Sequence, residues 1–286
     1  MGTTTINFEE TFSSMYPNYA FLIQYIHEAL GKDEIVWSDL TAFNLKRIAE
    51  YIKGKVTANS ANSYFARLKA FLNLMADDVE LPTNKFASIL KTKREPQQNV
   101  ALTEDEVERI YQYYRHIPKD IPLHKREKEV LTLFLLECYC GGRGVDVENM
   151  TTANIENGRL SYVSKKTHTL ATMPVHHRLR RLLLCKPKTE YSRMTKNRII
   201  KNACKKCGID EKVTIYYHGS MKTKPKYEFC GFHTARRSFA SMLAAKGVPV
   251  VEIAQYMSHS NISMTERYIK VDNKRSSEAA MKFFCG

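Results

Sequence analysis

The sequence lacks the features that mark membrane-bound, secreted or repetitive proteins. No run of about 18 apolar residues occurs, so we expect no transmembrane helix. The first residues, MGTTTINFEETF, contain neither a basic leader nor an apolar stretch, so no secretory signal is expected. Seven cysteines, odd in number and thinly spread, argue against a disulfide framework and favour a reducing cytoplasm. Internal repeats and low-complexity segments are also absent.

Acidic residues are too few to balance the basic ones, with 30 Asp and Glu against 44 Lys and Arg. The imbalance is local. Residues 1–100 contain 11 basic and 11 acidic residues, whereas residues 161–230 contain 17 basic and 4 acidic residues. Such a stretch is either a solvated basic face or a surface that faces phosphates. The charge therefore favours nucleic acid as a partner only modestly.

The length of 286 residues predicts about two domains at roughly 150 residues each. Apolar residues at helical spacing predict a compact helical first domain. Its expected helices cover residues 19–30, 37–52, 58–75 and 86–90. We place this domain at residues 1–95, a polar linker at 96–100 and a second domain at 101–286.

The second domain mixes helices with strands. Thr103 and Glu106 form a capping-box pattern that predicts a helix start, and a heavily apolar helix is expected over residues 126–138. Asn157-Gly158 predicts a hairpin turn. The expected strands cover residues 151–155, 159–163 and 170–175, and helices resume at His177. The predicted fold class is mainly α with a small antiparallel β-sheet, an α+β protein.

Five local patterns occur in a fixed order in the second domain. They are Gly141-Gly142-Arg143 with Asp146, Lys166 in the turn between two predicted strands, His233 with Arg236, Ser258-His259, and Tyr268 nine residues after His259. Together they resemble the tyrosine recombinase (phage integrase) family, which has type IB topoisomerases as relatives. The resemblance covers about residues 101–275, and the first domain matches only in its helical character. Each pattern alone is weak, but the ordered set is specific.

The resemblance implies a strand-transfer reaction on DNA. Tyr268 would attack a phosphodiester and form a covalent 3′-phosphotyrosyl intermediate. Arg143 and Arg236 would clamp the non-bridging oxygens, where the transition state gathers negative charge. Asp146, three residues after Arg143, would hold Arg143 or His233 in place.

The remaining predicted groups would transfer protons or bind the phosphate. Lys166 would protonate the leaving 5′-oxygen as general acid. The neighbouring Lys165 is the alternative, but the family places its lysine directly before Thr, which favours Lys166. His233 would take the tyrosine proton or bind the phosphate, and His259 would be a second donor to it. No cofactor or metal is needed, because the phosphotyrosine conserves the bond energy.

The resemblance also implies an architecture and partners. A helical SAM-like core-binding domain and the catalytic domain would close around double-stranded DNA. A C-terminal tail, about residues 271–286, would dock on a neighbouring protomer within a homo-tetramer on paired sites. Accessory DNA-bending or directionality proteins are compatible with this scheme, and the expected location is the cytoplasm, associated with the nucleoid. The DNA-binding candidates are Lys53, Lys55, Arg67, Lys69, Lys91, Lys93, Arg94, Lys165 and Arg237.

Integration, excision and inversion are all compatible with a recombinase function. Other interpretations of the sequence stay open. The chain could be a type IB-like topoisomerase, or a DNA-binding regulator whose site is inert. Ser258 stands where the family usually has Gly, and we expect this small residue to be tolerated. Cys204, Cys207, Cys230 and His233 have formal zinc-ribbon spacing, which would make His233 a ligand instead of a catalyst.

Overall fold

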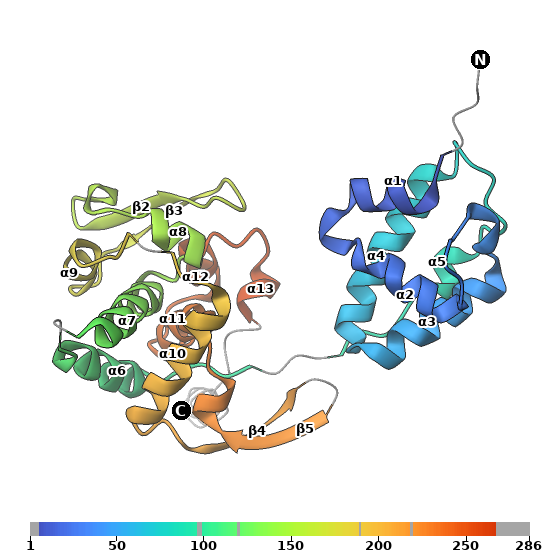
Figure 1. Cartoon of the computed structure of the whole chain (residues 1–286). Helices are drawn as coiled ribbons and strands as arrows, with labels where there is room; N and C mark the ends of the chain where they lie inside the picture. The colour runs from blue at the N-terminus through green and yellow to red at the C-terminus, as the bar shows by residue number, and fades with distance from the viewer. Residues whose placement is uncertain (1–5, 96–98, 119–120, 189, 218–219, 267–286) are drawn as a thin grey trace, which may run out of the picture. The chain divides into compact units, whose positions relative to one another are not determined.

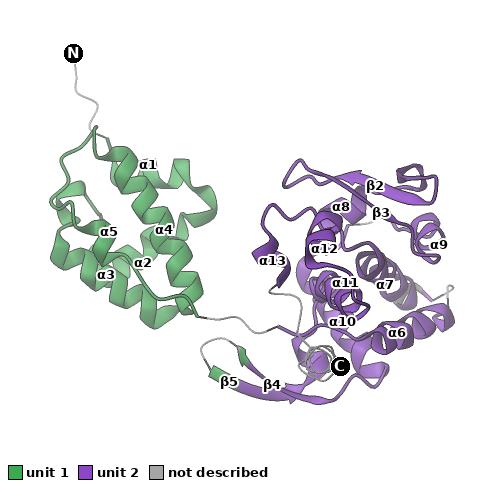
Figure 2. Ribbon diagram, turned by 180° about the vertical axis from the view of Figure 1, so that it is seen from behind, with its two compact units in different colours: residues 1–97, 216–221 green, residues 98–215, 222–286 purple. Residues whose placement is uncertain are grey.

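The computed structural model describes residues 6–95, 99–118, 121–188, 190–217 and 220–266 (Figure 1). The chain divides into two compact units, which comprise residues 1–97 with 216–221 and residues 98–215 with 222–286 (Figure 2). Each unit has a hydrophobic core of its own. Within the described ranges, no helix has the length and apolar character needed to cross a bilayer.

The N-terminal part of the first unit, residues 6–95, is helical, as predicted. Its elements are α1 (Phe8–Met15), η1 (Pro17–Tyr19), α2 (Phe21–Leu30), η2 (Trp37–Asp39), α3 (Ala42–Lys55), α4 (Ala58–Met75) and α5 (Phe86–Ile89). Hydroxyl caps start two of the helices: Thr41 Oγ1 accepts from the Asn44 N–H at 3.2 Å, and Thr57 Oγ1 accepts from the Ser60 N–H at 3.4 Å. Gly31 ends α2 with φ of +67°, which its lack of a Cβ permits.

Helix α1 was not predicted, because it buries only Phe8 and Phe12 and is too short to show a clear period. Both rings pack on Phe71, at centroid distances of 5.8 and 5.1 Å, and Trp37 stacks on the same ring at 5.6 Å. Aromatic packing across α1, η2 and α4 therefore forms the centre of this core.

The second unit is built around one long buried helix, α7 (Pro122–Cys140), which packs against five other helices (Figure 1). These are α6 (Glu104–His116), α8 (Gly144–Asn149), α9 (Leu179–Leu184), α10 (Arg193–Lys206) and α11 (Thr234–Ala245). Shorter helical elements of this unit include η4 (Lys226–Phe229), α12 (Val250–Tyr256) and α13 (Ile262–Glu266). The predicted capping box is confirmed: Thr103 Oγ1 accepts from the Glu106 N–H at 3.2 Å, and Glu106 Oε2 accepts from the Thr103 N–H at 2.7 Å.

A three-stranded antiparallel sheet runs in the order β1 (Ile155–Glu156), β2 (Arg159–Val163) and β3 (Leu170–Pro174). Asn157 and Gly158 have φ of +48° and +72°, so the predicted tight hairpin turn is confirmed. Leu160 pairs with Met173, and Tyr162 pairs with Ala171. All four of these paired side chains are buried, which gives the sheet one apolar face.

The strand predicted over residues 151–155 is wrong for most of its length. Residues 152–154 form a 3₁₀ turn, η3, and only Ile155 and Glu156 pair with β2. The Thr151 hydroxyl accepts from the Ala153 N–H at 3.3 Å, and Asn154 Oδ1 accepts from the Thr151 N–H at 2.8 Å. These local bonds satisfy the backbone without a strand partner, a common outcome for Thr and Asn.

A second hairpin, β4 (Lys212–Tyr217) and β5 (Ser220–Pro225), was not predicted. Its second strand, SMKTKP, has no buried position and therefore none of the apolar alternation that marks a strand in sequence. The fold class itself is confirmed: the chain is mainly helical, with small antiparallel sheets.

Candidate active site

The predicted site residues of the second unit lie at the ends of its central elements. Arg143 follows the C-terminus of α7 and precedes α8. His233 directly precedes α11, and Arg236 lies in the first turn of that helix. His259 follows α12, and Lys166 lies in the turn between β2 and β3. Segments far apart in the sequence therefore meet at one place.

Arg236 is buried, with 1% of its surface exposed. Its Nη1 donates to the carbonyl of Gly141 and its Nη2 donates to the carbonyl of Met257. Gly141 ends α7 with φ of +62°, and a Cβ there would lie 2.3 Å from the Phe239 ring. Only glycine fits this position, so it allows the end of α7 to approach α11 closely.

Arg143 is half-buried and is held by two other segments. Its Nη1 donates to Ser164 Oγ at 2.8 Å, and its Nη2 donates to the carbonyl of Ser258 at 3.5 Å. Asp146 is buried and accepts from the backbone N–H groups of Arg143 and Lys165, at 3.3 and 2.8 Å. The carboxylate therefore joins the start of α8 to the turn that contains Lys166.

Ser258 has left-handed backbone conformation, with φ of +51°, and is 4% exposed. This explains why a glycine suits the position, since a side chain is disfavoured there. The carbonyl of Ser258 accepts from Thr167 Oγ1 at 3.4 Å as well as from Arg143. Ser258 thus connects α12 to both Arg143 and the β2–β3 turn.

Both histidines lie in the positive field of the arginines. Partial burial, followed by the charges of Arg236, Arg143 and His233, lowers the pKa of His259 to about 3. Nδ1 of His259 lies 2.7 Å from Oγ1 of the buried Thr265, which fixes the ring. The His259 imidazole is therefore neutral near pH 7.

Desolvation of its ring, followed by four arginine charges, lowers the pKa of His233 to about 4. These arginines are Arg237, Arg236, Arg193 and Arg143. The residue as a whole is exposed, so solvent screens part of this effect. The direction of the shift still keeps His233 neutral and able to accept a proton.

Lys165 and Lys166 are both exposed in the turn between β2 and β3. The Ser164 N–H donates to the Thr169 carbonyl at 2.9 Å, and the His168 N–H donates to the Ser164 carbonyl at 2.8 Å, which closes this turn. Tyr268 and the tail from residue 271 lie outside the described residues.

The predicted DNA-binding residues of the first unit are partly paired with acids or aromatic rings. Lys53 lies 2.9 Å from Glu50 and Lys55 lies 3.8 Å from Glu28. Arg67 lies over the rings of Tyr16 and Tyr19, at 6.0 and 5.4 Å. Lys69 is half-buried, whereas Lys91, Lys93 and Arg94 are exposed. Lys53 and Lys55 line one hollow with Thr92 and Glu95 at the start of α4.

In the second unit, Arg237 donates from Nη1 to the carbonyl of Val100 at 3.5 Å. Within the described residues, no group of three or more His, Cys, Asp or Glu side chains lies close enough together to hold a metal ion. The structure therefore gives no support to the zinc-ribbon alternative. Cys230 is buried, and its Sγ lies 3.4 Å from the carbonyl of Lys226.

Four residues at the site were not predicted from the sequence. Ser164 and Thr265 bind Arg143 and His259, Asn197 Oδ1 accepts from the Phe232 N–H at 2.8 Å, and Arg193 adds to the field at His233. Ser, Thr and Asn are common everywhere, so no sequence pattern marks them. Ser164 is the one of the four whose place in the sequence, two residues before Lys166, could have indicated a role.

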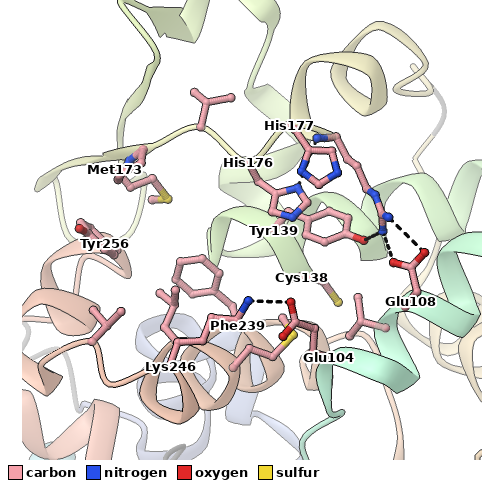
Figure 3. Close-up of a pocket in the computed structure, with 17 residues that line it drawn as sticks. Glu104, Glu108, Cys138, Tyr139, Met173, His176, His177, Phe239, Lys246 and Tyr256 are labelled. Atoms are coloured by element: carbon pink, nitrogen blue, oxygen red, sulfur yellow. Dashed lines mark hydrogen bonds and ion pairs between the residues drawn. The ribbon is translucent and has the colours of Figure 1, made fainter.

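An apolar cavity of about 400 Å³ lies on another face of α11 and contains none of the predicted site residues (Figure 3). Tyr139 stacks on His176 at 4.1 Å at its edge. The charged groups there are paired, since Arg178 binds Glu108 and Lys246 binds Glu104 at 2.7 Å. The predicted site residues lie instead at the starts of α8 and α11, after the end of α12 and in the β2–β3 turn.

Comparison with known proteins gives consistent matches over most of the chain. The sequence profile of the phage integrase family matches residues 40–275. Tyrosine recombinase XerC of Natranaerobius thermophilus is 21% identical over 266 residues, which cover 86% of this chain and 84% of that protein.

Two solved structures show the same fold. XerH recombinase bound to a palindromic difH substrate, in a post-cleavage complex, has a TM-score of 0.67 at 14% identity, over 94% of this chain and 79% of that one. A lambda integrase tetramer bound to a Holliday junction has a TM-score of 0.62 at 20% identity, over 92% of this chain and 75% of that one.

The left-handed conformation of Ser258 predicts a sharp difference between two substitutions. Ser258→Gly should change the free energy of unfolding by less than about 1 kcal/mol, because glycine adopts this conformation without strain. Ser258→Val should lower it by roughly 2 kcal/mol or more, since a β-branched residue is strained there and overfills a buried position. Urea unfolding measures both. Equal stability of the two variants would contradict the assigned backbone.

The lowered pKa of His259 predicts a loss of stability in acid. Unfolded histidines bind protons below about pH 6.5, whereas folded His259 stays neutral to about pH 3. The unfolded state therefore binds more protons within this window, and stability falls as the pH falls through it. His259→Gln should reduce the slope of the urea midpoint against pH between pH 6.5 and 5, and the remaining slope includes the contribution of His233. His116→Gln, at an exposed position of α6, is the control and should keep the wild-type slope.

Proposed function

Because this chain belongs to the phage integrase family, we propose that Arg143, Arg236, His233 and His259 bind the scissile phosphate of DNA. The protein is a tyrosine-type site-specific recombinase, which cuts and rejoins DNA. The observation that supports this site best is the convergence of two guanidiniums and two neutral imidazoles from three separate segments.

The arginines suit the transition state of phosphoryl transfer, in which negative charge gathers on the non-bridging oxygens. A guanidinium has five N–H donors, so Arg143 can bind Ser164 and Ser258 and still donate to a phosphate. Arg236 is fixed by two carbonyls, so its charge needs no reorganisation during the reaction. Loss of such a stabiliser typically slows a reaction by about 100-fold or more.

The proton transfers follow from the protonation states at the site. Neutral His233 accepts the proton of the Tyr268 hydroxyl as that oxygen attacks phosphorus. His259 contacts the phosphate through Nε2, because Nδ1 lies against Thr265. Lys166, in the exposed turn, gives its proton to the departing 5′-oxygen. Lys165 is the less favoured alternative, and its backbone N–H is bound to Asp146.

The basic residues suit double-stranded DNA as the partner. The basic residues of 161–230, a range that lies mostly in the second unit, supply phosphate contacts, and Lys91, Lys93 and Arg94 supply exposed cations in the first. We place the core-binding domain at residues 1–95 and the catalytic domain at 101–286. We also propose that the protein assembles as a homo-tetramer on paired DNA sites, with accessory proteins. Its proposed location is the cytoplasm, at the nucleoid.

Covalent trapping tests the function. Nicked duplexes of randomised sequence lose a short fragment after cleavage, so adducts accumulate and can be isolated with detergent and sequenced. The wild type should form a covalent adduct at a defined sequence, and Tyr268→Phe should form none, because the nucleophilic oxygen is removed. Tyr113→Phe, in α6, should react like the wild type.

Two results would contradict the assignment. Adduct formation by Tyr268→Phe would exclude this tyrosine as nucleophile, and the absence of any wild-type adduct would favour an inert DNA-binding regulator. Duplexes with one or two copies of the recovered sequence distinguish a recombinase from a type IB-like topoisomerase. Strand exchange between two copies requires a recombinase, whereas relaxation of supercoils by a monomer indicates a type IB-like topoisomerase.

We propose further that the tail, residues 271–286, docks on a neighbouring protomer. It contains apolar residues close to the end of the chain, which are Ala279, Ala280, Met281, Phe283 and Phe284. Deletion of residues 275–286 should abolish cooperative assembly on two-site DNA and leave single-site binding intact. Gel mobility of the DNA at increasing protein concentration measures both single-site binding and assembly. Unchanged assembly after the deletion would exclude docking by the tail.

A further inference from the structure

Ser164 lies where the β2–β3 turn meets Arg143. Its backbone closes the turn, because its N–H donates to Thr169 and its carbonyl accepts from His168. Its side chain is fully buried, with 0% exposure. The residue that shapes the turn of Lys166 therefore also points its hydroxyl into the protein.

The hydroxyl of Ser164 connects two charged groups. Oγ accepts from Arg143 Nη1 at 2.8 Å and donates to Asp146 Oδ2 at 3.2 Å. A hydroxyl has one hydrogen and two lone pairs, so it makes both bonds at once. Asp146 Oδ1 accepts from the N–H of Lys165 at 2.8 Å, which closes a ring of bonds beside Lys166. Charged partners make such hydrogen bonds stronger than neutral ones.

The carbonyl of Ser258 gives a second connection between the same two parts. It accepts from Arg143 Nη2 at 3.5 Å and from Thr167 Oγ1 at 3.4 Å. The turn is thus held on both sides of Lys166, at Lys165 and at Thr167. The contacts of Ser164 are shorter, and the one to Asp146 is buried.

We propose that Ser164 is a positioning residue that fixes the turn of Lys166 relative to the guanidinium of Arg143. This rests on the proposed function. When Tyr268 Oη bonds to phosphorus and the bond from phosphorus to the 5′-oxygen breaks, Lys166 protonates that oxygen. Arg143 stabilises the charge on the non-bridging oxygens, and His233 accepts the tyrosine proton. Both Lys166 and Arg143 act on one phosphate, so a small error in their relative position slows cleavage.

Single-turnover cleavage by Ser164→Ala tests the proposal. The probes are the nicked duplex recovered by covalent trapping and the same duplex with sulfur in place of the bridging 5′-oxygen. A thiolate leaves without a proton, because thiols are far more acidic than alcohols, so the sulfur duplex does not need Lys166. Ser161→Ala is the matched control, since Ser161 lies in β2 and its hydroxyl contacts Thr172 Oγ1 at 3.0 Å.

We expect Ser164→Ala to slow cleavage of the oxygen duplex by roughly 10- to 100-fold, the usual effect of losing a hydrogen bond to a charged group. The sulfur duplex should be slowed by a clearly smaller factor, because only the Arg143 contact matters there. DNA affinity should stay near that of the wild type, and the melting temperature should fall only by a few degrees, because Arg143 and Asp146 each lose one partner. Ser164→Cys, which keeps a weak donor and acceptor, should recover part of the rate, and Ser161→Ala should react like the wild type.

Other patterns of rates overturn the proposal. Equal slowing of both duplexes would exclude a link to Lys166, and slowing of the oxygen duplex alone would exclude a link to Arg143. Wild-type rates in Ser164→Ala would exclude both links, and a much lower melting temperature with no recovery in Ser164→Cys would indicate a purely structural role. A wild type that forms no adduct refutes the proposed function itself, a separate outcome visible before any variant is compared.

Discussion

The buried guanidinium of Arg236 is the interaction on which the site depends. A buried charge is costly unless hydrogen-bond acceptors surround it. Two backbone carbonyls, of Gly141 at the end of α7 and Met257 at the end of α12, accept from it. Both lie at helix C-termini, where the helix dipole favours a cation. Arg143 follows Gly141 by two residues and Ser258 follows Met257 directly, so one buried side chain sets the positions of the others.

Burial and the same concentration of positive charge together set the protonation of the two histidines. Desolvation of the two rings, followed by the arginine charges, keeps His233 and His259 neutral, which suits a proton acceptor and a donor to an anion. Glu137, fully buried in α7, does not cancel this field. Burial raises the pKa of its carboxyl well above the usual range and favours the neutral acid, despite the nearby charge of Arg236. The surface stays positive where a phosphate would bind.

Local sequence rules succeeded where a few neighbouring residues decide the structure. The capping box at Thr103, the turn at Asn157-Gly158 and the helical first unit all depend on contacts within a few residues. They failed at residues 151–155, where side-chain bonds to the backbone replaced a strand, and at β4–β5, which lacks apolar alternation. Ser164 was also missed, because a serine acquires its role only from the charged groups that the fold brings to it.

By itself, the sequence determined the family, the fold class and the order of the chemical groups, because residue types and spacing are properties of the chain. Only the tertiary structure decided how those groups are held. It showed that Ser258 needs left-handed backbone, that Asp146 joins Arg143 to the β2–β3 turn, and that both imidazoles are neutral. The last two depend on segments remote in sequence that the fold brings close together, because hydrogen bonds and charge interactions weaken with distance.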